Sequence, residues 1–225
     1  ADDGGITVFP AEKFAKSVQA VQIIPLSDEI VKVTLSPSRR FSSDTGLVVS
    51  RNLSPVPYEL KEAGDTLTLL TSALQVLVLK TTGKVSFLDT DGNPVLLGES
   101  GFTNQFEPVT IDGVRSYAIR EVFESPGEEA LYGLGQHQAG EMNYKGRNEE
   151  LFQYNTKVSV PFIVSTKNYG LYWDNYSFSR FGDPRPSGRP RHRVDELFHN
   201  GGPAEGSVPR AGHRIGQTDG RSPRF

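Results

Sequence analysis

A loop rich in amide, hydroxyl and guanidinium side chains is the part of this 225-residue sequence best suited to binding an uncharged polar ligand. It begins in the string YGLGQ, whose two glycines predict a positive φ or a very close neighbour. It runs to two later apolar strings, VSVPFIVS and YGLYWD. Long polar loops between strands are commonly functional, and these side chains can bind hydroxyl groups. The candidate residues are Gln136, Asn143, Tyr144, Arg147, Asn155 and Thr156.

The string Asp89–Asn93 resembles the start of a calcium loop, but its spacing favours a structural role. Its glycine stands at loop position 4, where an EF-hand requires position 6, and Ser100 stands where a bidentate glutamate is needed. A hairpin turn between two strands fits the string better. We expect no metal and no cofactor, and a sequence without cysteine can form neither disulfides nor thiolate metal sites.

Aromatic residues gather in the string YGLYWDNYSF, from Tyr169 to Phe178. Aromatic faces bind the C–H side of pyranose rings, so these residues could form a sugar-stacking platform or contact another domain. The candidates for that role are Trp173, Tyr172 and Tyr144. Alternation along a strand predicts core packing for the same kind of side chain, and both interpretations stay open.

Short runs of β-branched and aromatic residues predict strands along most of the chain, because their apolar positions repeat with a period of two. Turn residues separate the runs about every ten residues, as in a β-sandwich. The predicted strands are Ile6–Phe9, Ala20–Leu26, Glu29–Leu35, Gly46–Ser50, Thr66–Thr71, Leu74–Lys80, Val85–Leu88, Val95–Leu97, Val114–Val122, Ala130–Leu134, Val158–Ser165 and Tyr169–Asp174. Ala11–Ala20 predicts an extended segment or one helical turn. We therefore predict an all-β, antiparallel sandwich over residues 1–184.

The last segment, 185–225, has a different composition. It contains eight of the 15 arginines, none of the nine lysines and three of the four histidines, with glycine and proline throughout. Its lack of apolar periodicity predicts a disordered tail with no fold, because little apolar burial offsets the entropy of ordering. Three origins stay open: a flexible linker, a shifted reading frame or sequence error, and a basic interaction tail.

The net charge and the hydropathy of the sequence limit which classes of binding partner we expect. A net charge of −3 gives no reason to expect nucleic acid or an anionic membrane as partner. No apolar run approaches the roughly 18 residues that span a bilayer. The polar start Ala1–Gly5 is compatible with a mature end left by a removed secretion signal, and equally with an artificial start. We expect a periplasmic or secreted bacterial protein.

Five strings resemble one family of enzymes. YGLGQ, NYKG, QYNT, PF and NYGLYWDN occur in this order within Leu131–Asp183, and together they resemble the end of the N-terminal β-sandwich of glycoside hydrolase family 31. The variant YGLGQHQ…NYKG looks most like the α-xylosidase branch, and Leu74–Leu96 supports the resemblance loosely. It implies a sandwich of the galactose-mutarotase-like type that packs on a catalytic barrel of the same parent chain.

The resemblance also implies where the chemistry takes place. In the family the two catalytic carboxyl groups come from the barrel, in a motif of the Trp-x-Asp-Met-Asn-Glu type, and Trp173-Asp174-Asn175 is not that motif. We therefore expect no catalytic residue in this chain and no activity from it alone. Asn155 and Thr156 are implied at the rim of the pocket, with Gln136 and Arg147 as further candidates. The implied substrate of the parent is a xyloglucan-type oligosaccharide or an α-glucoside.

Two other functions stay open. A free-standing carbohydrate-binding module could work through the same aromatic and amide loop. An aldose epimerase has a similar sandwich, but the family resemblance implies a pair of catalytic histidines, and only His137 precedes the tail. A lone histidine in a loop is more typical of structural hydrogen bonding, which we predict for His137.

Overall fold

The computed structural model describes eleven ranges of the chain: residues 4–11, 18–41, 55–93, 97–99, 105–111, 113–124, 128–138, 140–175, 177–182, 194–203 and 211–217. Every regular element in them is a β-strand, and the strands pair antiparallel. No helix of the described residues is long and apolar enough to cross a membrane. The predicted all-β, antiparallel fold is confirmed.

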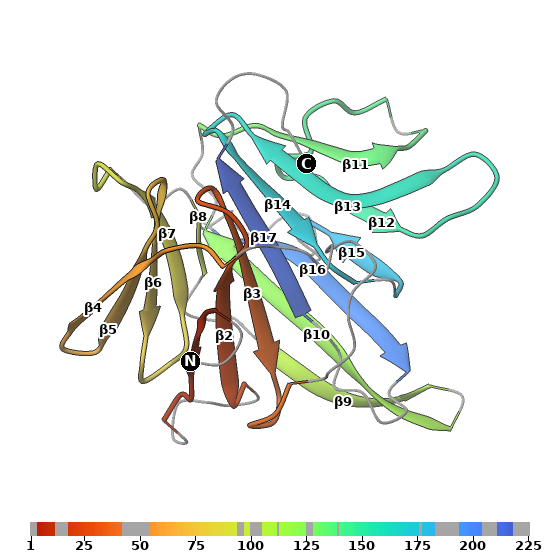
Figure 1. The fold of residues 1–225 in the computed structure, drawn as a ribbon. Coiled ribbons are helices and arrows are strands. Elements are labelled where there is room, and N and C mark those ends of the chain that lie inside the picture. Colours follow the sequence, from red (N-terminus) through yellow and green to blue (C-terminus); the bar gives the residue numbers. More distant parts are fainter. Residues whose placement is uncertain are drawn as a thin grey trace.

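The strands form two sheets (Figure 1). The first sheet has seven strands, in the order β1 (Ile6–Val8), β2 (Ala20–Pro25), β3 (Ile30–Ser36), β17 (Ala211–Gln217), β14 (Tyr169–Trp173), β13 (Val158–Ser165) and β11 (Leu131–Gln136). The second has ten strands, in the order β12 (Glu149–Leu151), β15 (Ser179–Phe181), β16 (Val194–Pro203), β10 (Val114–Glu124), β8 (Leu97–Glu99), β7 (Val85–Asp89), β6 (Leu74–Leu79), β5 (Thr66–Leu70) and β4 (Glu59–Ala63), with β9 (Gln105–Ile111) also paired to β10.

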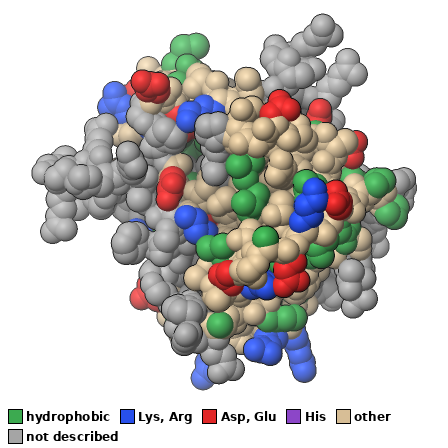
Figure 2. Space-filling model, turned by 90° about the vertical axis from the view of Figure 1, so that its left-hand side faces the viewer, with side chains coloured by type: hydrophobic (Ala, Val, Ile, Leu, Met, Phe, Trp, Pro, Cys, Tyr) green, Lys and Arg blue, Asp and Glu red, His purple; other side chains and the backbone are tan. Residues whose placement is uncertain are grey.

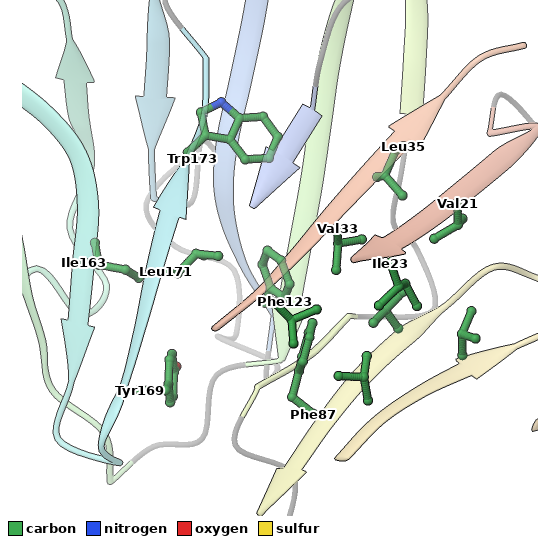
Figure 3. Close-up of a cluster of buried hydrophobic side chains, with 14 of the residues drawn as sticks. Val21, Ile23, Val33, Leu35, Phe87, Phe123, Ile163, Tyr169, Leu171 and Trp173 are labelled. Carbon is green, nitrogen blue, oxygen red and sulfur yellow. The ribbon is translucent and has the colours of Figure 1, made fainter. Parts of the chain in front are cut away.

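The hydrophobic core lies between the two sheets (Figure 3). The first sheet contributes side chains from β2, β3, β13 and β14, and the second contributes Phe87 from β7 and Phe123 from β10. Trp173 and Leu171 alternate with the half-buried Tyr172 along β14. Burying one large apolar side chain stabilises the fold by about 1.5–3 kcal/mol. Of the interpretations left open for Trp173, full burial of its side chain favours core packing.

Most predicted strands occur within two residues of their predicted ends. β6 and β7 match the strands predicted over 74–80 and 85–88, and β8 begins at the last residue of the one predicted over 95–97. Residues 46–50 and 12–17 lie outside the described residues. Among the described strands that precede residue 185, four were not predicted: β4, β9, β12 and β15.

The turn after β7 is a hairpin connection, as predicted for Asp89–Asn93. The backbone N–H groups of Asp91 and Asn93 donate to Asp89 Oδ1 over 3.1 and 2.9 Å, and Asn93 Nδ2 donates to Oδ2 over 2.5 Å. These hydrogen bonds, above all that from the Asn93 amide, lower the pKa of Asp89. β7 then pairs with β8. The carboxylate therefore organises the turn, and the described residues contain no group of three or more metal-binding side chains.

The structure differs from the prediction that 185–225 has no fold. Val194–Pro203 forms β16 between β10 and β15, and Ala211–Gln217 forms β17 between β3 and β14. The composition of 185–225 predicts only that its own side chains bury little apolar surface. Strand pairing needs only backbone N–H and C=O groups, and these are present in almost any sequence. Residues 194–203 and 211–217 are therefore strands despite their composition. The other residues of 185–225 lie outside the described part, and for them the absence of a fold stays a prediction.

The end of the second sheet formed by β4 to β7 carries charges of both signs. Figure 2 shows acidic and basic side chains interspersed with apolar ones on this face. All five residues of β4 are exposed, and Lys61 and Lys80 form ion pairs of 3.5 and 2.5 Å with Glu59 and Glu62. Charged side chains on an edge strand discourage pairing with other chains.

Candidate functional site

The candidate loop between β11 and β13 ends in a tight hairpin. An isolated bridge joins Tyr154 to Lys157, and the Lys157 N–H donates to the Tyr154 carbonyl over 2.9 Å. Asn155 and Thr156 form the two-residue turn and are both exposed. Their amide and hydroxyl groups are therefore presented to the surroundings at one end of the first sheet.

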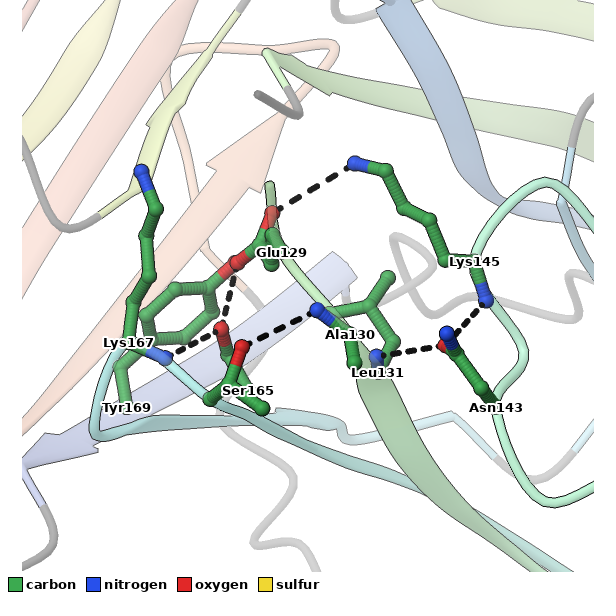
Figure 4. Close-up of polar contacts among 9 residues, drawn as sticks. Glu129, Ala130, Leu131, Asn143, Lys145, Ser165, Lys167 and Tyr169 are labelled. Carbon is green, nitrogen blue, oxygen red and sulfur yellow. Dashed lines mark hydrogen bonds and ion pairs between the residues drawn. The ribbon is translucent and has the colours of Figure 1, made fainter. Parts of the chain in front are cut away.

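The NYKG string has a different role, because it lies along the free edge of β11 (Figure 4). Asn143 Oδ1 accepts hydrogen bonds from the Leu131 and Lys145 backbone N–H groups over 3.0 and 2.9 Å. The Tyr144 N–H donates to the Leu131 carbonyl over 2.8 Å. Edge strands leave backbone groups unpaired, and this segment pairs some of them. Asn143 is thus part of the scaffold at the start of β11.

A buried carboxylate fastens the same segment to the sheet (Figure 4). Glu129 Oε1 accepts hydrogen bonds from Ser165 Oγ, over 2.5 Å, and from the Tyr169 hydroxyl. The Lys145 ammonium lies 3.6 Å from Oε2. Glu129 is only 4% exposed, so its charge needs these partners to be tolerated. These contacts therefore fix Lys145 and the segment around it to the strands β13 and β14.

The two glycines of YGLGQ meet the requirement predicted for them. Gly133, Leu134 and Gly135 have φ values of 125°, 65° and 95°. A Cβ atom on Gly133 would lie 2.4 Å from the Phe162 carbonyl oxygen, and one on Gly135 would lie 2.1 Å from that of Val158. Both a positive φ and a close neighbour therefore exclude a side chain at these positions.

This stretch is also where the pairing of β11 with β13 shifts register. Gly133 pairs with Ile163 and Gly135 with Ser159, so three residues of β13 stand opposite Leu134. One of the three is Pro161, which has no N–H to donate to a neighbouring strand. A proline in a strand between two others is tolerated at such an irregularity. The PF string and the YGLG string thus form one structural feature.

A cluster of three side chains that sequence reasoning did not bring together lies beneath the hairpin. His137 Nε2 lies 2.6 Å from the Leu134 carbonyl oxygen, and its Nδ1 lies 3.2 Å from Glu149 Oε1. Lys157 Nζ lies 2.6 Å from the same oxygen. Nearby, burial and then the charges of Glu149 and Glu141 raise the pKa of Tyr144. The prediction of a structural hydrogen bond for His137 is confirmed, whereas its contact with β12 has no local signal in the sequence.

Three exposed aromatic rings flank the hairpin, and we call them the aromatic patch: Phe152, Tyr154 and Phe178. Phe152 stacks on Tyr154 with ring centroids 5.3 Å apart and an interplanar angle of 22°, and it lies 5.9 Å from Phe178. The three side chains are 41%, 53% and 42% exposed. Lys157 and Arg180 place cationic groups over Phe152 and Phe178.

The aromatic patch replaces the stacking platform expected from the sequence. Trp173 is fully buried and Tyr144 is 5% exposed, so neither presents a ring face to a sugar in this structure. Alternation along β14 and the docking of NYKG direct these two rings into the core. Tyr172 is half-buried. It stays a candidate for a contact with another domain.

The remaining candidates differ in their distance along the loop from the hairpin. Gln136 is exposed and pairs with Val158, the residue that follows the hairpin. Arg147 is exposed and lies 3.4 Å from Glu141. Both residues precede β12 in the sequence, whereas the hairpin follows it. The structure therefore places Gln136 at the end of the sheet that carries Asn155 and Thr156. Arg147 instead pairs with Glu141, within the segment between β11 and β12.

Known proteins resemble this chain in sequence and in fold. Residues 20–181 match the family described as glycosyl hydrolase 31 N-terminal galactose mutarotase-like domain. The chain is 31% identical over 167 residues to an α-xylosidase of Saccharolobus solfataricus, which covers 70% of this chain and 22% of that protein. It is 37% identical to a GH31 α-xylosidase of Xanthomonas citri, with a TM-score of 0.74 over 83% of this chain and 20% of that one.

A more distant structure shares the fold alone. The cycloalternan-forming enzyme of Listeria monocytogenes, solved in complex with a pentasaccharide substrate, has 17% identity and a TM-score of 0.73 over 97% of this chain and 20% of that one. This chain spans about a fifth of the length of the relatives it matches. The match over residues 20–181, the two antiparallel sheets and the identity to both α-xylosidases agree: the chain belongs to the family of glycosyl hydrolase 31 N-terminal galactose mutarotase-like domains.

Proposed function

We propose that this chain is the N-terminal sandwich of a retaining α-glycosidase and that its hairpin completes the rim of an active site carried by a catalytic barrel. The observation that carries the proposal is the exposed turn Asn155–Thr156, directly followed by Lys157, whose largely buried ammonium lies 2.6 Å from the largely buried Glu149 Oε1. A rim residue must be accessible and at the same time fixed, because binding an ordered group costs less entropy. The barrel supplies the two catalytic carboxyl groups that a retaining mechanism needs.

We propose the substrate class from the names of two similar proteins. Two relatives that are more than 30% identical over most of this chain are named α-xylosidases, so we propose an α-xylosyl group on a xyloglucan-type oligosaccharide, with an α-glucoside as the alternative. Asn155 offers an amide that both donates to and accepts from sugar hydroxyls. Because this amide is neutral, it binds more weakly than a carboxylate would.

A free-standing carbohydrate-binding module is a second candidate, favoured by the aromatic patch. Exposed aromatic rings next to an amide and a hydroxyl are a common form of sugar site, and the patch has both. The same rings would suit a contact with the barrel. Titration calorimetry of this chain alone with xyloglucan oligosaccharides separates the two functions, since a module binds sugar without a barrel.

The test of the proposed rim is Asn155→Ala in a protein that joins this domain to its barrel. With an aryl α-xyloside as substrate, we expect kcat/KM to fall by about tenfold, equivalent to roughly 1.4 kcal/mol of transition-state stabilisation. The control is Gln75→Ala on β6, which removes an amide that donates to the Thr90 carbonyl far from the hairpin. An unchanged kcat/KM in folded Asn155→Ala would remove the hairpin from the active site.

A further inference from the structure

The hairpin is tied at its last residue to charges shielded from water. Lys157 Nζ lies 2.6 Å from Glu149 Oε1, and His137 Nδ1 lies 3.2 Å from the same atom. The side chains of Lys157, Glu149 and His137 are 10%, 12% and 1% exposed. Charged groups at this depth are costly unless they stay paired. Movement of the hairpin away from β12 would therefore leave the Glu149 carboxylate short of a partner.

The other end of the cluster is fixed to the most constrained backbone of the first sheet. A carbonyl oxygen only accepts, so His137 Nε2 carries a hydrogen and donates it to the Leu134 carbonyl over 2.6 Å. Leu134 has a φ of 65°, and its side chain is fully buried. The His137 ring also packs edge-on against Tyr144, with centroids 6.2 Å apart. The imidazole is thus held by its Nε2 side, whereas Nδ1 lies 3.2 Å from Glu149 Oε1 without the geometry of a hydrogen bond and attracts this carboxylate only on a protonated ring.

We propose that His137 is a positioning residue that acts through Glu149 and Lys157 to hold the Asn155–Thr156 turn in place. The histidine links the irregular stretch of β11 to a hairpin twenty residues further along the chain, through one carboxylate on the second sheet. Its consequence for catalysis rests on the proposed function of the hairpin. The positioning itself concerns contacts within this chain and can be measured without a barrel.

Amide hydrogen exchange of the 225-residue chain, followed by NMR, measures the positioning directly. The reporter is the Lys157 N–H, which closes the hairpin, and the references are Ile163 and Leu171, paired between β13 and β14. In His137→Phe, which keeps a ring against Tyr144 but loses both nitrogens, we expect Lys157 exchange to accelerate about tenfold with the references unchanged. Glu149→Gln should accelerate it as well.

The matched control is Glu150→Gln, the next residue of the same strand. Glu150 is 52% exposed and pairs with Arg180 over 3.2 Å, so this variant removes the same charge from the outer side of β12. We expect no change in Lys157 exchange. If His137→Phe fails to fold, Lys157→Met tests the same cluster from the hairpin side, with Gln153 and Tyr154 amides as reporters. The proposal is overturned if exchange at the hairpin stays at its wild-type rate in these variants.

Coupling between the two ends separates positioning from general stability. Residues that act as one unit give non-additive effects. We expect the double variant of His137→Phe and Lys157→Met to accelerate exchange at the hairpin no more than the larger single change. A double effect equal to the product of the single factors, or equal acceleration of hairpin and reference amides, would show that His137 has no positioning role.

Activity supplies the last arm, in the protein that joins this domain to its barrel. We expect His137→Phe to lower kcat/KM by the same factor as Asn155→Ala, and the double variant to lower it no further. If the hairpin loosens while kcat/KM stays unchanged, the positioning role stands and the proposed function of the hairpin fails. If the hairpin stays ordered in His137→Phe, the positioning role fails whatever the activity.

Discussion

Gly135 has a backbone conformation that would be strained in a residue with a side chain. It also lies very close to the backbone of the neighbouring strand β13. Its φ is 95°, and an added Cβ would lie 2.1 Å from the Val158 carbonyl oxygen. We expect Gly135→Ala to lower the free energy of unfolding by about 3 kcal/mol, because strain and close approach act together. Gly140→Ala is the control: its φ is 56° with nothing within 4 Å, so the loss should be about 1 kcal/mol. Equal losses in urea unfolding would contradict the close approach.

Two carboxyl groups, Glu99 on β8 and Glu121 on β10, are fully buried in the second sheet. Glu99 Oε2 accepts a hydrogen bond from the Val85 N–H over 2.8 Å, which favours its charged form. Burial and then the charge of Glu99 raise the pKa of Glu121 well above its ordinary value. Two buried carboxylates oppose each other's charge, so Glu121 is the member of the pair whose neutral form is favoured by folding.

This raised pKa makes stability depend on pH. A group whose pKa is higher in the folded state contributes stability that is complete below its unfolded pKa, about 4.3, and is lost as pH rises through the folded value. In that window we expect the unfolding free energy of the wild type to fall by up to about 1.4 kcal/mol per pH unit from this group. Glu121→Gln, which keeps a neutral side chain, should remove that slope in urea unfolding across pH, whereas Glu124→Gln at the exposed end of β10 should retain it.

Residue-scale features differ in how far the sequence could predict them. The glycine spacing in YGLGQ predicted a positive φ or a close neighbour, and both occur. The exposure of Asn155 and Thr156 also follows from a polar turn between strands. The contacts of His137 with Glu149, and of Glu149 with Lys157, depend on how β12 docks beside the loop. No spacing or periodicity in the sequence records that docking.

At the scale of elements, the strands that sequence patterns missed share a physical cause. β4 is exposed along its whole length, so it has no alternation of apolar and polar residues. β9 contains Pro108 and, among the described strands, pairs with β10 alone, and an edge position tolerates a residue without an N–H. β12 and β15 have three residues each, too few to show a period. Core strands such as β6 were predictable because burial on one face imposes alternation.

The strands β16 and β17 show the limit of composition as a predictor of elements. Each lies between two strands from earlier in the chain, β16 between β10 and β15 and β17 between β3 and β14 (Figure 1). Their pairing uses backbone groups, which differ little between sequences, while composition measures side-chain burial. A segment can therefore lack an amphipathic pattern and still form a strand where it can pair with a strand of the sheet on each side.

At the scale of the whole molecule, the aromatic patch is the surface whose exposure needs an explanation. Its rings stack on one another around the hairpin, although the core of the sandwich is already complete without them. Contiguous exposed apolar groups beside polar ones mark interaction sites. A catalytic barrel that covers the patch would place the Asn155–Thr156 turn beside its own pocket. A sugar that covers it would make the domain a binding module.

Tyr154→Ser distinguishes these two partners. The ring is 53% exposed, so its loss should change the unfolding free energy of this chain alone by less than about 1 kcal/mol. In the protein joined to its barrel, we expect the same change to weaken the contact between the domains by about 2 kcal/mol, the usual loss for a central aromatic residue of an interface. Differential scanning calorimetry of both proteins measures the two effects.

The opposite result has an equally clear physical meaning. If Tyr154→Ser leaves the joined protein as stable as the wild type but abolishes binding of xyloglucan oligosaccharides to this chain alone, the patch binds sugar directly. Leu60→Ser is the control, because Leu60 is 48% exposed on β4, at the far edge of the second sheet. It removes a comparable exposed apolar side chain where neither a barrel nor a sugar is expected. A loss confined to Tyr154→Ser therefore reports on the partner of the patch and not on exposed apolar area in general.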